Sequence, residues 1–406
     1  MNRAAVIVNS RPILSELIGW IADCGTDVVL LTSCHSIVDD SEIDALRAAG
    51  VDVTVLDDYD APSVTGLIHA ACERVRAGAL ISLTEADVIR CATVRERLGI
   101  IGQDTASATA YRDKYVMKSH CSLAGIKTAA MARADDDNGL ARLAAGAEML
   151  VVKPVRGVAA KNTYVAHSLG AVRHLLDEIG HPSDFLVEEF VIGDMYHVDG
   201  LMLDGKVIQS WPSRYLYQQW QTMYEAKPNL SAMLPADDPL TERLNATTAN
   251  VVTALPPAAG LHALHAEYFV RDDDRIVLCE IASRTGGAGI VEAYERSFGV
   301  SLYGEPLRQQ LGAPPSDDCF ADVPRQRHGW GWFPPRRGTL VALPDTCALP
   351  GTVRYSGTAN VGRRFDGPHA VTDAVVEVSF ALNETTPVLD TLRAYDAWWR
   401  KAGTWA

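Results

Sequence analysis

Residues 266–287 read AEYFVRDDDRIVLCEIASRTGG and contain two apolar stretches that each carry one glutamate. The two stretches and the acidic run Asp272–Asp274 between them predict a β-hairpin. If the strands pair, Glu267 and Glu280 face one cavity and offer the two carboxylates that Mg²⁺ prefers beside phosphate oxygens and water. Two acids near a turn are more often solvated surface groups, so the pair alone does not establish a metal site.

An arginine and a glycine-rich turn follow the second predicted strand, at Arg284, Gly286 and Gly287. An arginine at this point can stabilise charge that develops on a transferred phosphoryl group, or it can bind a substrate carboxylate through two hydrogen bonds. The order of acid, arginine and glycines therefore favours a binding site over a solvated turn.

Two lysines and a loop of small residues precede this hairpin. Lys153 ends the apolar run 149–152, Lys114 lies upstream of it, and the loop from Gly157 to Lys161 includes Ala160. Small side chains let backbone N–H groups approach a phosphate chain, and flanking cations neutralise its charge. The P-loop pattern Gly-x-x-x-x-Gly-Lys-Ser/Thr is absent. Most lysines are exposed, but Lys153 is distinctive because it ends a strongly apolar strand.

A predicted strand with two acids lies between the lysines and the hairpin. Its last residues are Glu188, Glu189, Phe190 and Val191. The edge of such a strand can receive an adenine, because backbone groups read the edge of the base while an apolar side chain packs on its face. Taken alone, the pattern indicates only a strand.

Short apolar runs and amphipathic stretches alternate in the first part of the chain. The predicted strands lie at 4–8, 28–31, 51–55 and 79–82, and the predicted helices lie at 13–24 and 63–76. This alternation predicts a small doubly wound α/β unit. No G-x-G-x-x-G follows the first strand, so the sequence does not assign a dinucleotide to this unit.

The later part of the chain favours antiparallel strands. Predicted strands at 186–191 and 196–203 are followed by Asp204 and Gly205, a pair typical of hairpin turns. Beyond residue 314 the chain shifts to Pro, Gly and β-forming residues, and an amphipathic segment at 386–401 resembles a closing helix. The sequence thus predicts an α+β region followed by a mostly β appendage.

The composition limits the partners. The 406 residues include 37 Lys and Arg against 51 Asp and Glu, which gives a net charge of −14. An acidic surface disfavours nucleic acid and anionic membranes, although a local basic pocket remains allowed. The eight cysteines form no Cys-x-x-Cys pair, and no apolar run reaches the roughly 18 residues of a membrane helix. We therefore expect a cytoplasmic protein whose partners are small molecules or proteins, with no nucleic acid and no membrane.

Taken in order along the chain, these motifs resemble the ATP-grasp superfamily, in particular its carboxylate–amine ligase branch, which includes L-amino acid ligases. The matching segments are 113–114, 151–154, 157–161, 187–193, 196–200, 265–267 and 280–287. Each motif is degenerate, but the ordered set is specific. The resemblance implies an α/β and α+β fold, with a Rossmann-like pre-ATP-grasp domain over residues 1–107, an ATP-grasp domain over 108–313 whose central subdomain spans about 115–185, and a β-rich C-terminal subdomain over 314–406.

The resemblance also implies a role for each matched position. The ATP-binding positions would be Lys114, Lys153, Gly157, Ala160, Lys161, Glu188, Glu189, Phe190 and Val191. Glu267 and Glu280 would bind Mg²⁺, and Arg284 would act with Lys153 in catalysis. Arg284, Gly286 and Gly287 would also contact the substrate.

Two positions depart from the family pattern. Ala282 replaces an asparagine that supplies a further metal or phosphate ligand in many relatives, so the number of Mg²⁺ ions stays open, with water or Ser283 as the substitute ligand. Met195 replaces a glutamate that commonly helps to bind the ribose; either Asp194 or Asp199 would take over that contact, or the nucleotide contact would differ.

The substrate side is less specific. The aromatic segment 211–220 includes Arg214, which is a candidate ligand for a substrate carboxylate. His262 and His265 are either site residues or hydrogen-bonded structural histidines. We interpret the segment 329–333 as a seam between domains rather than as a lid.

In the family's reaction a substrate carboxylate attacks the γ-phosphate of ATP and gives an acyl phosphate and ADP, after which an amine displaces phosphate. The resemblance therefore predicts an ADP-forming carbon–nitrogen ligase that joins amino acids or similar small acids to an amine, as used in specialised metabolism. The alternatives are an ATP-grasp enzyme with a carrier-protein, thiol or bicarbonate acceptor, and a nucleotide-binding protein without turnover. A monomer and a homodimer both remain open.

Overall fold

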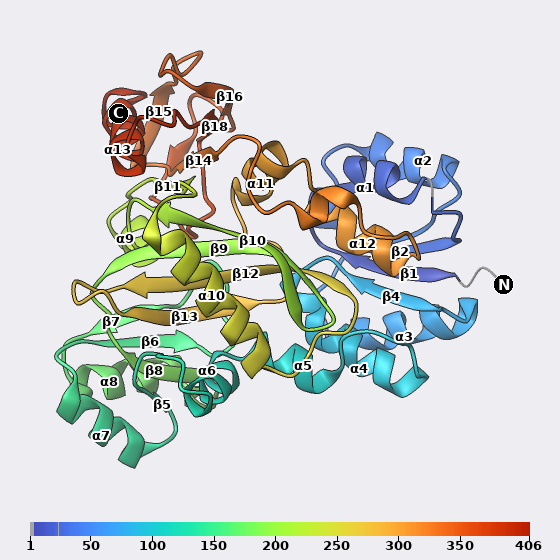
Figure 1. Ribbon diagram of the computed structural model, residues 1–406, viewed down its shortest axis with the longest axis horizontal. Helices are drawn as coiled ribbons and strands as arrows, with labels where there is room; N and C mark the ends of the chain where they lie inside the picture. The colour runs from blue at the N-terminus through green and yellow to red at the C-terminus, as the bar shows by residue number, and fades with distance from the viewer. Residues whose placement is uncertain (1–3, 23) are drawn as a thin grey trace.

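The computed structural model describes residues 4–22 and 24–406, which form four β-sheets with helices packed around them (Figure 1). Residues 1–3 of the predicted first domain and Asp23 of the predicted helix at 13–24 lie outside the described residues. Within the described ranges, no helix has the length and apolar character needed to cross a membrane.

The N-terminal unit is a parallel sheet with helices on both faces. Its strands are β1 (Ala5–Asn9), β2 (Val28–Ser33), β3 (Asp52–Leu56) and β4 (Ala79–Ser82), in the order β3-β2-β1-β4, and its helices are α1 (Leu14–Ile21), α2 (Asp40–Ala48), α3 (Val64–Val75) and α4 (Val88–Leu98). Ile7 of β1 packs into one core and Val8 into the other. Burial on both faces explains the continuous apolar runs, and the four predicted strands are confirmed.

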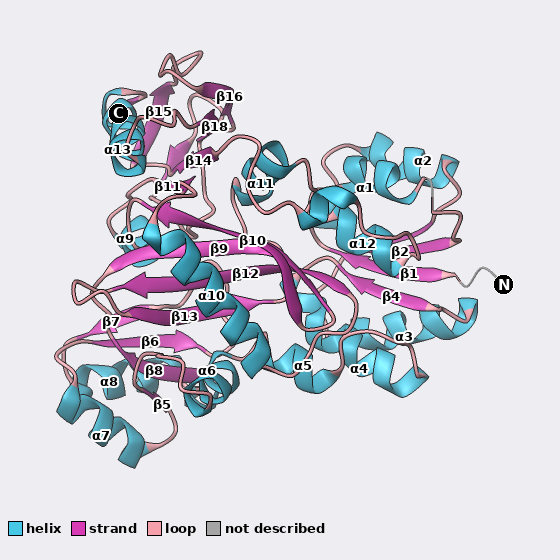
Figure 2. Ribbon diagram, in the orientation of Figure 1, coloured by secondary structure: helices cyan, strands magenta, loops and turns pink. Residues whose placement is uncertain are grey.

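A small antiparallel sheet with two covering helices follows. Its strands are β5 (Met131–Arg133), β6 (Leu150–Pro154), β7 (Tyr164–Ala166) and β8 (Phe185–Glu189), in the order β5-β8-β6-β7. Helices α7 (Asp137–Gly146) and α8 (Leu169–Ile179) cover its outer side (Figure 2). Helices α5 (Thr105–Ala110) and α6 (Lys114–Leu123) connect this sheet to the N-terminal unit.

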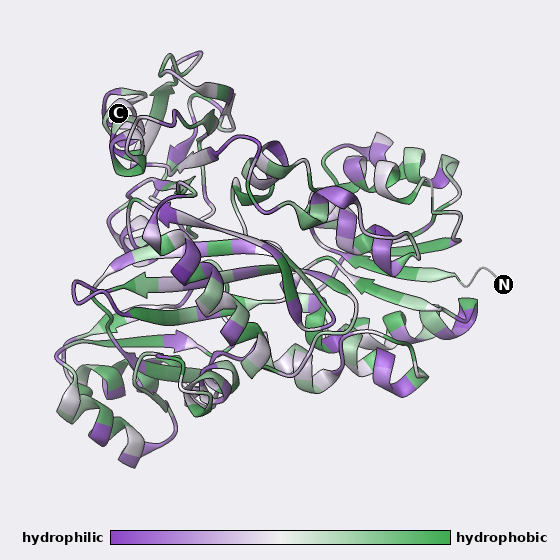
Figure 3. Ribbon diagram, viewed as in Figure 1, coloured by the Kyte–Doolittle hydropathy of each residue, from purple (hydrophilic) through white to green (hydrophobic). Residues whose placement is uncertain are grey.

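The largest sheet has eight strands and forms the centre of the molecule. In spatial order they are β13 (Ile276–Ala282), β12 (Leu261–Val270), β9 (Asp194–Leu203), β10 (Lys206–Tyr215), β11 (Asn229–Met233), β14 (His328–Phe333), β18 (Val376–Ala381) and β16 (Thr352–Gly357). Helix α10 (Pro239–Ala254) packs across one face, where Val251 joins a core with Leu264. Hydrophobic residues concentrate along the strands, while the covering helices are mixed (Figure 3).

The two predicted hairpins are present. The turn between β9 and β10 has positive φ at both Asp204 and Gly205, the geometry that a tight hairpin turn requires. In the second hairpin, β12 pairs antiparallel with β13, and Glu267 lies directly opposite Glu280. The register therefore brings the two predicted metal ligands side by side.

The C-terminal part is not a detached appendage. Strands β14, β18 and β16 extend the central sheet beyond β11, because Ala232 of β11 pairs with Gly329 of β14. Only β15 (Gly338–Ala342), β17 (Arg364–Phe365) and β19 (Thr404–Trp405) form a separate small sheet, and α13 (Val388–Lys401) closes the unit. Pairing with β14 covers an edge of β11 that would otherwise expose its backbone groups.

The chain also returns to the N-terminal unit after the central sheet. Helix α11 (Ile290–Phe298) is followed by α12 (Gly304–Gln310), whose Leu307 is buried in the same core as β1. Nearby, Tyr303 stacks on Trp20 with ring centroids 6.1 Å apart. The N-terminal unit and the central sheet thus share a packed interface, which fixes the space between them.

Gly200 gives a test of the central sheet. A Cβ on Gly200 would lie 2.0 Å from the carbonyl oxygen of Gln209 on the neighbouring strand, whereas a Cβ on Gly66 in α3 would meet nothing within 4 Å. We expect Gly200→Ala to lower the free energy of unfolding by about 1–3 kcal/mol because the strands must separate. Gly66→Ala is the control and should raise it by about 0.5–1 kcal/mol. Urea unfolding followed by circular dichroism measures both, and equal effects would contradict the packing described.

Candidate functional site

A cavity of about 500 Å³ lies where the N-terminal unit, the small sheet and the central sheet meet. Most of the site residues predicted from the sequence line it: Lys114, Lys153, Gly157, Ala160, Lys161, Glu188, Glu189, Phe190, Val191, Glu267, Glu280, Arg284 and Gly287. These residues span more than 170 positions of the chain, so only the tertiary structure brings them together.

Lys114 enters the cavity because its helix begins there. The Asp113 side chain accepts hydrogen bonds from the backbone N–H groups of Tyr115 and Val116 and so caps α6. Lys114 Nζ lies 3.0 Å from Glu280 Oε2 and donates to the carbonyl oxygen of Gly157 at 2.8 Å. One ammonium group thus contacts both a predicted metal ligand and the loop of small residues.

Lys153 stands at the end of buried strand β6 and pairs with Glu188. Its Nζ lies 2.8 Å from Glu188 Oε2, and the other oxygen of Glu188 accepts a hydrogen bond from Lys118. Burial would lower the pKa of Lys153, but Glu188 raises it overall, so the ammonium is charged at neutral pH. Lys118 is fully buried and does not line the cavity, and no sequence motif marks it.

The loop of small residues has an unusual backbone. Ala159, Ala160 and Asn162 all have positive φ, a region that residues with a side chain seldom adopt. The carbonyl oxygen of Ala159 accepts a long hydrogen bond, 3.5 Å, from the backbone N–H of Val371. The loop therefore reaches the C-terminal region across the cavity, and its backbone groups are held close to Lys114.

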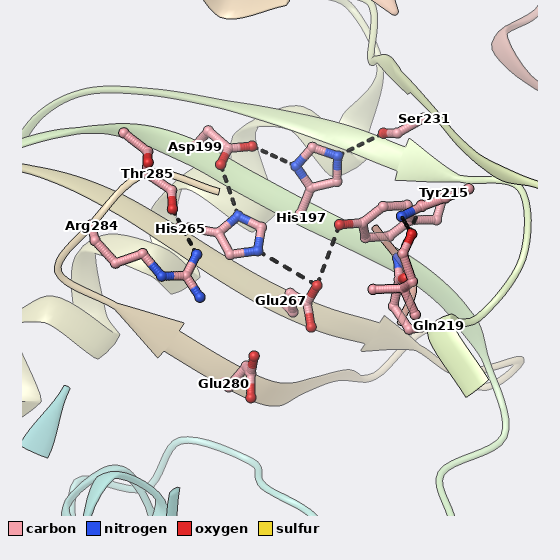
Figure 4. A network of polar contacts seen from close by, with 12 residues as sticks. His197, Asp199, Tyr215, Gln219, Ser231, His265, Glu267, Glu280, Arg284 and Thr285 are labelled. Atoms are coloured by element: carbon pink, nitrogen blue, oxygen red, sulfur yellow. Dashed lines mark hydrogen bonds and ion pairs between the residues drawn. The ribbon is translucent and has the colours of Figure 1, made fainter. Parts of the chain in front are cut away.

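The paired acids lie open to the cavity and have cationic neighbours. Figure 4 shows Glu267 and Glu280 on adjacent strands, with Tyr215 Oη donating to Glu267 Oε1 at 3.3 Å. Burial alone would raise the pKa of Glu280, but the ammonium groups of Lys114 and Lys153 lower it to about 2. A half-buried carboxylate pair of this kind suits a divalent cation.

A buried hydrogen-bonded chain supports Glu267 from behind. Asp199 accepts hydrogen bonds from Nδ1 of His197 and, at 2.8 Å, from Nδ1 of His265, while His265 Nε2 lies 3.5 Å from Glu267 Oε1 (Figure 4). Burial would lower the pKa of His265, but Asp199 raises it to about 10, so this histidine is an imidazolium. His197, Asp199 and His265 lie close enough to hold a metal ion, yet their mutual hydrogen bonds already account for the arrangement.

Arg284 is held by an acid from the N-terminal unit. Its Nε donates to Glu85 Oε2 at 2.7 Å, and its Nη1 donates to the carbonyl oxygen of Thr285 at 2.6 Å. Arg112 lies 3.4 Å from the other oxygen of Glu85. Burial would raise the pKa of Glu85, but Arg284 and then Arg112 lower it overall. No local motif marks Glu85 or Arg112, so the sequence does not predict that they join the site.

Three predicted site residues do not line the cavity. Asp199 is 2% exposed, and both of its oxygens accept from histidines, so the predicted ribose contact is wrong. Arg214 donates to Asp194 at 2.6 Å instead of facing a substrate, and Asp194 is thereby occupied as well. Gly286 is packed behind the wall, where a Cβ would lie 2.5 Å from Ile290.

Ser283 does not replace the missing asparagine. Its hydroxyl exchanges hydrogen bonds with the side chain of Gln103, at 3.0 Å and 3.2 Å, and it does not line the cavity. Met195, which the resemblance sets against a ribose-binding glutamate, is buried and lines the cavity. Both departures therefore make this part of the wall more apolar.

Two pairs of aromatic side chains also line the cavity. Tyr215 and Trp330 meet edge to face, with centroids 6.3 Å apart, and Trp220 meets Phe190 in the same way at 5.8 Å. Trp330 lies on β14, so the predicted seam also contributes to the cavity. His262 does not line it: the ring bonds the Ala259 carbonyl oxygen, and burial lowers its pKa to about 4.

The fold resembles solved structures along its whole length. An L-amino acid ligase from Bacillus licheniformis superposes with a TM-score of 0.75 at 15% identity, covering 100% of this chain and 99% of that chain. The biotin carboxylase domain of a 2-oxoglutarate carboxylase from Hydrogenobacter thermophilus, in complex with magnesium ADP and bicarbonate, superposes with a TM-score of 0.67 at 14% identity, covering 99% and 90%. This chain has the ATP-grasp fold.

In sequence, the chain is similar to a curated protein from Bacillus subtilis, the L-arginine-specific L-amino acid ligase. The two are 26% identical over 247 residues, which is 58% of each. The chain thus matches less than two thirds of the length of that relative. No family model matches the chain.

The imidazolium of His265 predicts a pH-dependent stability. Asp199 raises the pKa of His265 to about 10, whereas the usual pKa of a histidine is near 6.5. The stability that the charged His265–Asp199 pair gives the folded protein is therefore complete below pH 6.5 and is lost as pH rises through 10. Asp199→Asn removes the buried counter-charge and should cost about 3–5 kcal/mol at pH 6. We expect the difference between wild type and variant in urea unfolding to shrink between pH 6 and pH 9. A difference that stays constant over this range would show that His265 is neutral in the folded protein.

Proposed function

We propose that the chain is an ADP-forming carboxylate–amine ligase that uses Mg²⁺-ATP and joins an amino acid or similar small acid to an amine. The observation that carries this proposal is the convergence of two lysines, a facing pair of glutamates and an arginine in one cavity: Lys114, Lys153, Glu267, Glu280 and Arg284. The lysines can neutralise phosphate charge, the glutamates can bind Mg²⁺, and the arginine can stabilise the charge that develops during acyl transfer.

The nucleotide would lie between the small sheet and the central sheet. Lys114 and Lys153 would bind its phosphates, and the loop from Gly157 to Lys161 would cover them with backbone N–H groups. The adenine would lie against the strand end at Glu188–Val191, where Phe190 is braced by Trp220. The N-terminal unit would correspond to the pre-ATP-grasp domain of the family.

The residues present fit Mg²⁺. Glu267 and Glu280 are adjacent in register, open to the cavity and close to the phosphate-binding lysine Lys114. When bound, Mg²⁺ would neutralise phosphate charge and orient the phosphate oxygens. Glu280 is ionised above its pKa of about 2, and Glu267 is oriented by Tyr215 and His265.

Arg284 would act on the acyl phosphate. The substrate carboxylate attacks the γ-phosphorus and ADP leaves, after which the amine nitrogen attacks the acyl carbon and phosphate leaves with the bonding electron pair. Negative charge develops on oxygen in both steps, and Arg284 would stabilise it. Because Glu85 fixes Nε and the Thr285 carbonyl fixes Nη1, the guanidinium is held in position before substrate binds.

The similarities support amino acids as substrates. The curated relative is an L-amino acid ligase specific for L-arginine, and a solved structure of similar fold is also an L-amino acid ligase. The acid substrate would occupy the part of the cavity near Arg284 and Gly287. The protein would act in the cytoplasm. The aromatic pair of Tyr215 and Trp330 borders that part and favours an apolar side chain on the substrate.

A product assay tests the function. The purified protein is incubated with Mg²⁺-ATP and pools of amino acids and small acids, and ADP with phosphate and AMP with pyrophosphate are measured together with new amides by mass spectrometry. We expect substrate-dependent ADP and phosphate release with a condensed product. AMP and pyrophosphate would mean an adenylate intermediate and would overturn the acyl-phosphate proposal.

Two pairs of variants test the assigned roles. We expect Glu280→Gln to lower substrate-dependent ADP release at least about 100-fold, because the carboxylate pair is broken. Glu73→Gln, on the exposed face of α3, is the matched control and should leave the rate unchanged. Lys153→Met should raise the KM for ATP or abolish turnover, whereas Lys206→Met in the exposed hairpin should not. Normal kinetics in either test variant would refute the role of that residue.

A further inference from the structure

Three charged side chains form a buried cluster at the wall of the cavity: Lys118, Lys153 and Glu188. Glu188 Oε2 lies 2.8 Å from Nζ of Lys153, and Glu188 Oε1 accepts a hydrogen bond from Nζ of Lys118. The exposed fractions of the side chains are 1% for Lys118, 10% for Lys153 and 5% for Glu188. Each oxygen of the single carboxylate therefore contacts a different lysine.

Lys118 does not line the cavity, although the same helix carries it and Lys114. The two lysines are four residues apart, so they lie on one face of α6. Lys114 reaches Glu280 of the central sheet, whereas Lys118 reaches Glu188 of the small sheet, its only ion-pair partner among the described residues. Like charges at this spacing are unfavourable in a helix and a buried lysine is costly, so helix stability and packing do not explain Lys118.

Lys118 restricts how Glu188 can contact Lys153. An ammonium group has three N–H donors, and Glu188 Oε2 occupies one donor of Lys153. If Lys118 released Oε1, that buried oxygen would need a new donor, and Lys153 is the other lysine in contact with the carboxylate. Because Lys118 holds Oε1, the remaining donors of Lys153 stay available to a ligand in the cavity.

The contact between Lys118 and Glu188 persists in either charge state of the lysine. Burial lowers the pKa of Lys118 overall, although the negative charge of Glu188 opposes that shift. Since a neutral amine also donates an N–H, Lys118 can hold Oε1 with or without its extra proton. The restriction on Glu188 therefore depends on the hydrogen bond and not on the charge of Lys118.

Lys153 must be anchored at the end of a buried strand and still be free to bind phosphate. We propose that Lys118 is a positioning residue for the nucleotide: it holds one oxygen of Glu188 and thereby limits the competition between Glu188 and the ATP phosphates for Lys153. Lys118 acts through Glu188, because it does not itself line the cavity. This inference rests on the proposed function, in which Lys153 binds the phosphates.

The same contacts keep the side chain of Glu188 away from the base. Both of its oxygens are occupied by lysines, so neither is available to the amino group of an adenine. The strand end at Glu188–Val191 would then read the base through its backbone groups, while the side chain of Glu188 serves the phosphate end of the nucleotide.

The test compares a nucleotide with the nucleoside that lacks its phosphates. The Kd values of ATP and adenosine are measured by isothermal titration calorimetry on the full chain, with Mg²⁺ and without an acid substrate, so that no ligation occurs. Adenosine shares the base and the ribose with ATP, so the ratio of the two Kd values isolates the phosphate contacts. The variants are Lys118→Met and Glu188→Gln, and Lys127→Met, at an exposed position beyond the end of α6, is the control.

The two variants should change the preference for ATP over adenosine in opposite directions. In Lys118→Met, Glu188 can turn both oxygens to Lys153, and we expect the preference to fall about 10-fold, the size of one charge-assisted hydrogen bond. In Glu188→Gln, Lys153 loses its counter-charge, and we expect the preference to rise about 3-fold or more. Lys127→Met should keep the wild-type preference.

Two results would overturn the role of Lys118 alone. The first is a change in the same direction in both variants, which a purely structural cluster would give. The second is an equal loss of affinity for ATP and for adenosine. If Lys118→Met does not fold, Glu188→Gln decides, because a lower preference for ATP in that variant contradicts competition for Lys153. A wild type that binds ATP no more tightly than adenosine would overturn the proposed function together with the role of Lys118.

Discussion

The site is built around the repulsion between two carboxylates. Glu267 and Glu280 lie opposite each other on paired strands, largely out of water, where like charges facing each other are unfavourable. The pair is tolerated because cations surround it: Lys114 contacts Glu280, and the His265 imidazolium faces Glu267. A bound divalent cation would complete the balance. The strands and helices of the three sheets position these charged side chains around the cavity.

Each cation arrives on a different element, so the charge balance couples the sheets. Lys153 is carried by the small sheet, and Lys114 by the helix that precedes it. Arg284 follows β13 of the central sheet but is fixed by Glu85 of the N-terminal unit. A shift of any one sheet would leave a buried charge without its partner, which costs more than a lost surface ion pair. The cavity is therefore defined by electrostatics as well as by packing.

A further set of buried polar groups holds the charged residues in place. Hydrogen bonds between buried side chains link Ser231, His197, Asp199 and His265, and His265 Nε2 lies 3.5 Å from Glu267. The side chain of Gln103 hydrogen-bonds the hydroxyl of Ser283, which therefore does not face the cavity. Ala282 beside Ser283 carries no oxygen ligand in its side chain, so the proposed metal site depends on the two glutamates and on the phosphates. The C-terminal strands contribute as well, since Trp330 on β14 lies in the same sheet and borders the same cavity.

Several local features follow directly from residues that are close together in the chain. The apolar runs fixed the parallel strands of the N-terminal unit, Asp204 and Gly205 fixed a hairpin turn, and the spacing of Glu267 and Glu280 about an acidic turn fixed their pairing, because each depends on residues close together in the chain. Three further features became visible in the folded chain: Asp199 supports the wall instead of lining it, Glu85 and Arg112 join the site, and the C-terminal strands continue the central sheet. These features depend on contacts between segments far apart in sequence. Burial and charge pairing determine which residues meet, and no local sequence pattern predicts those contacts.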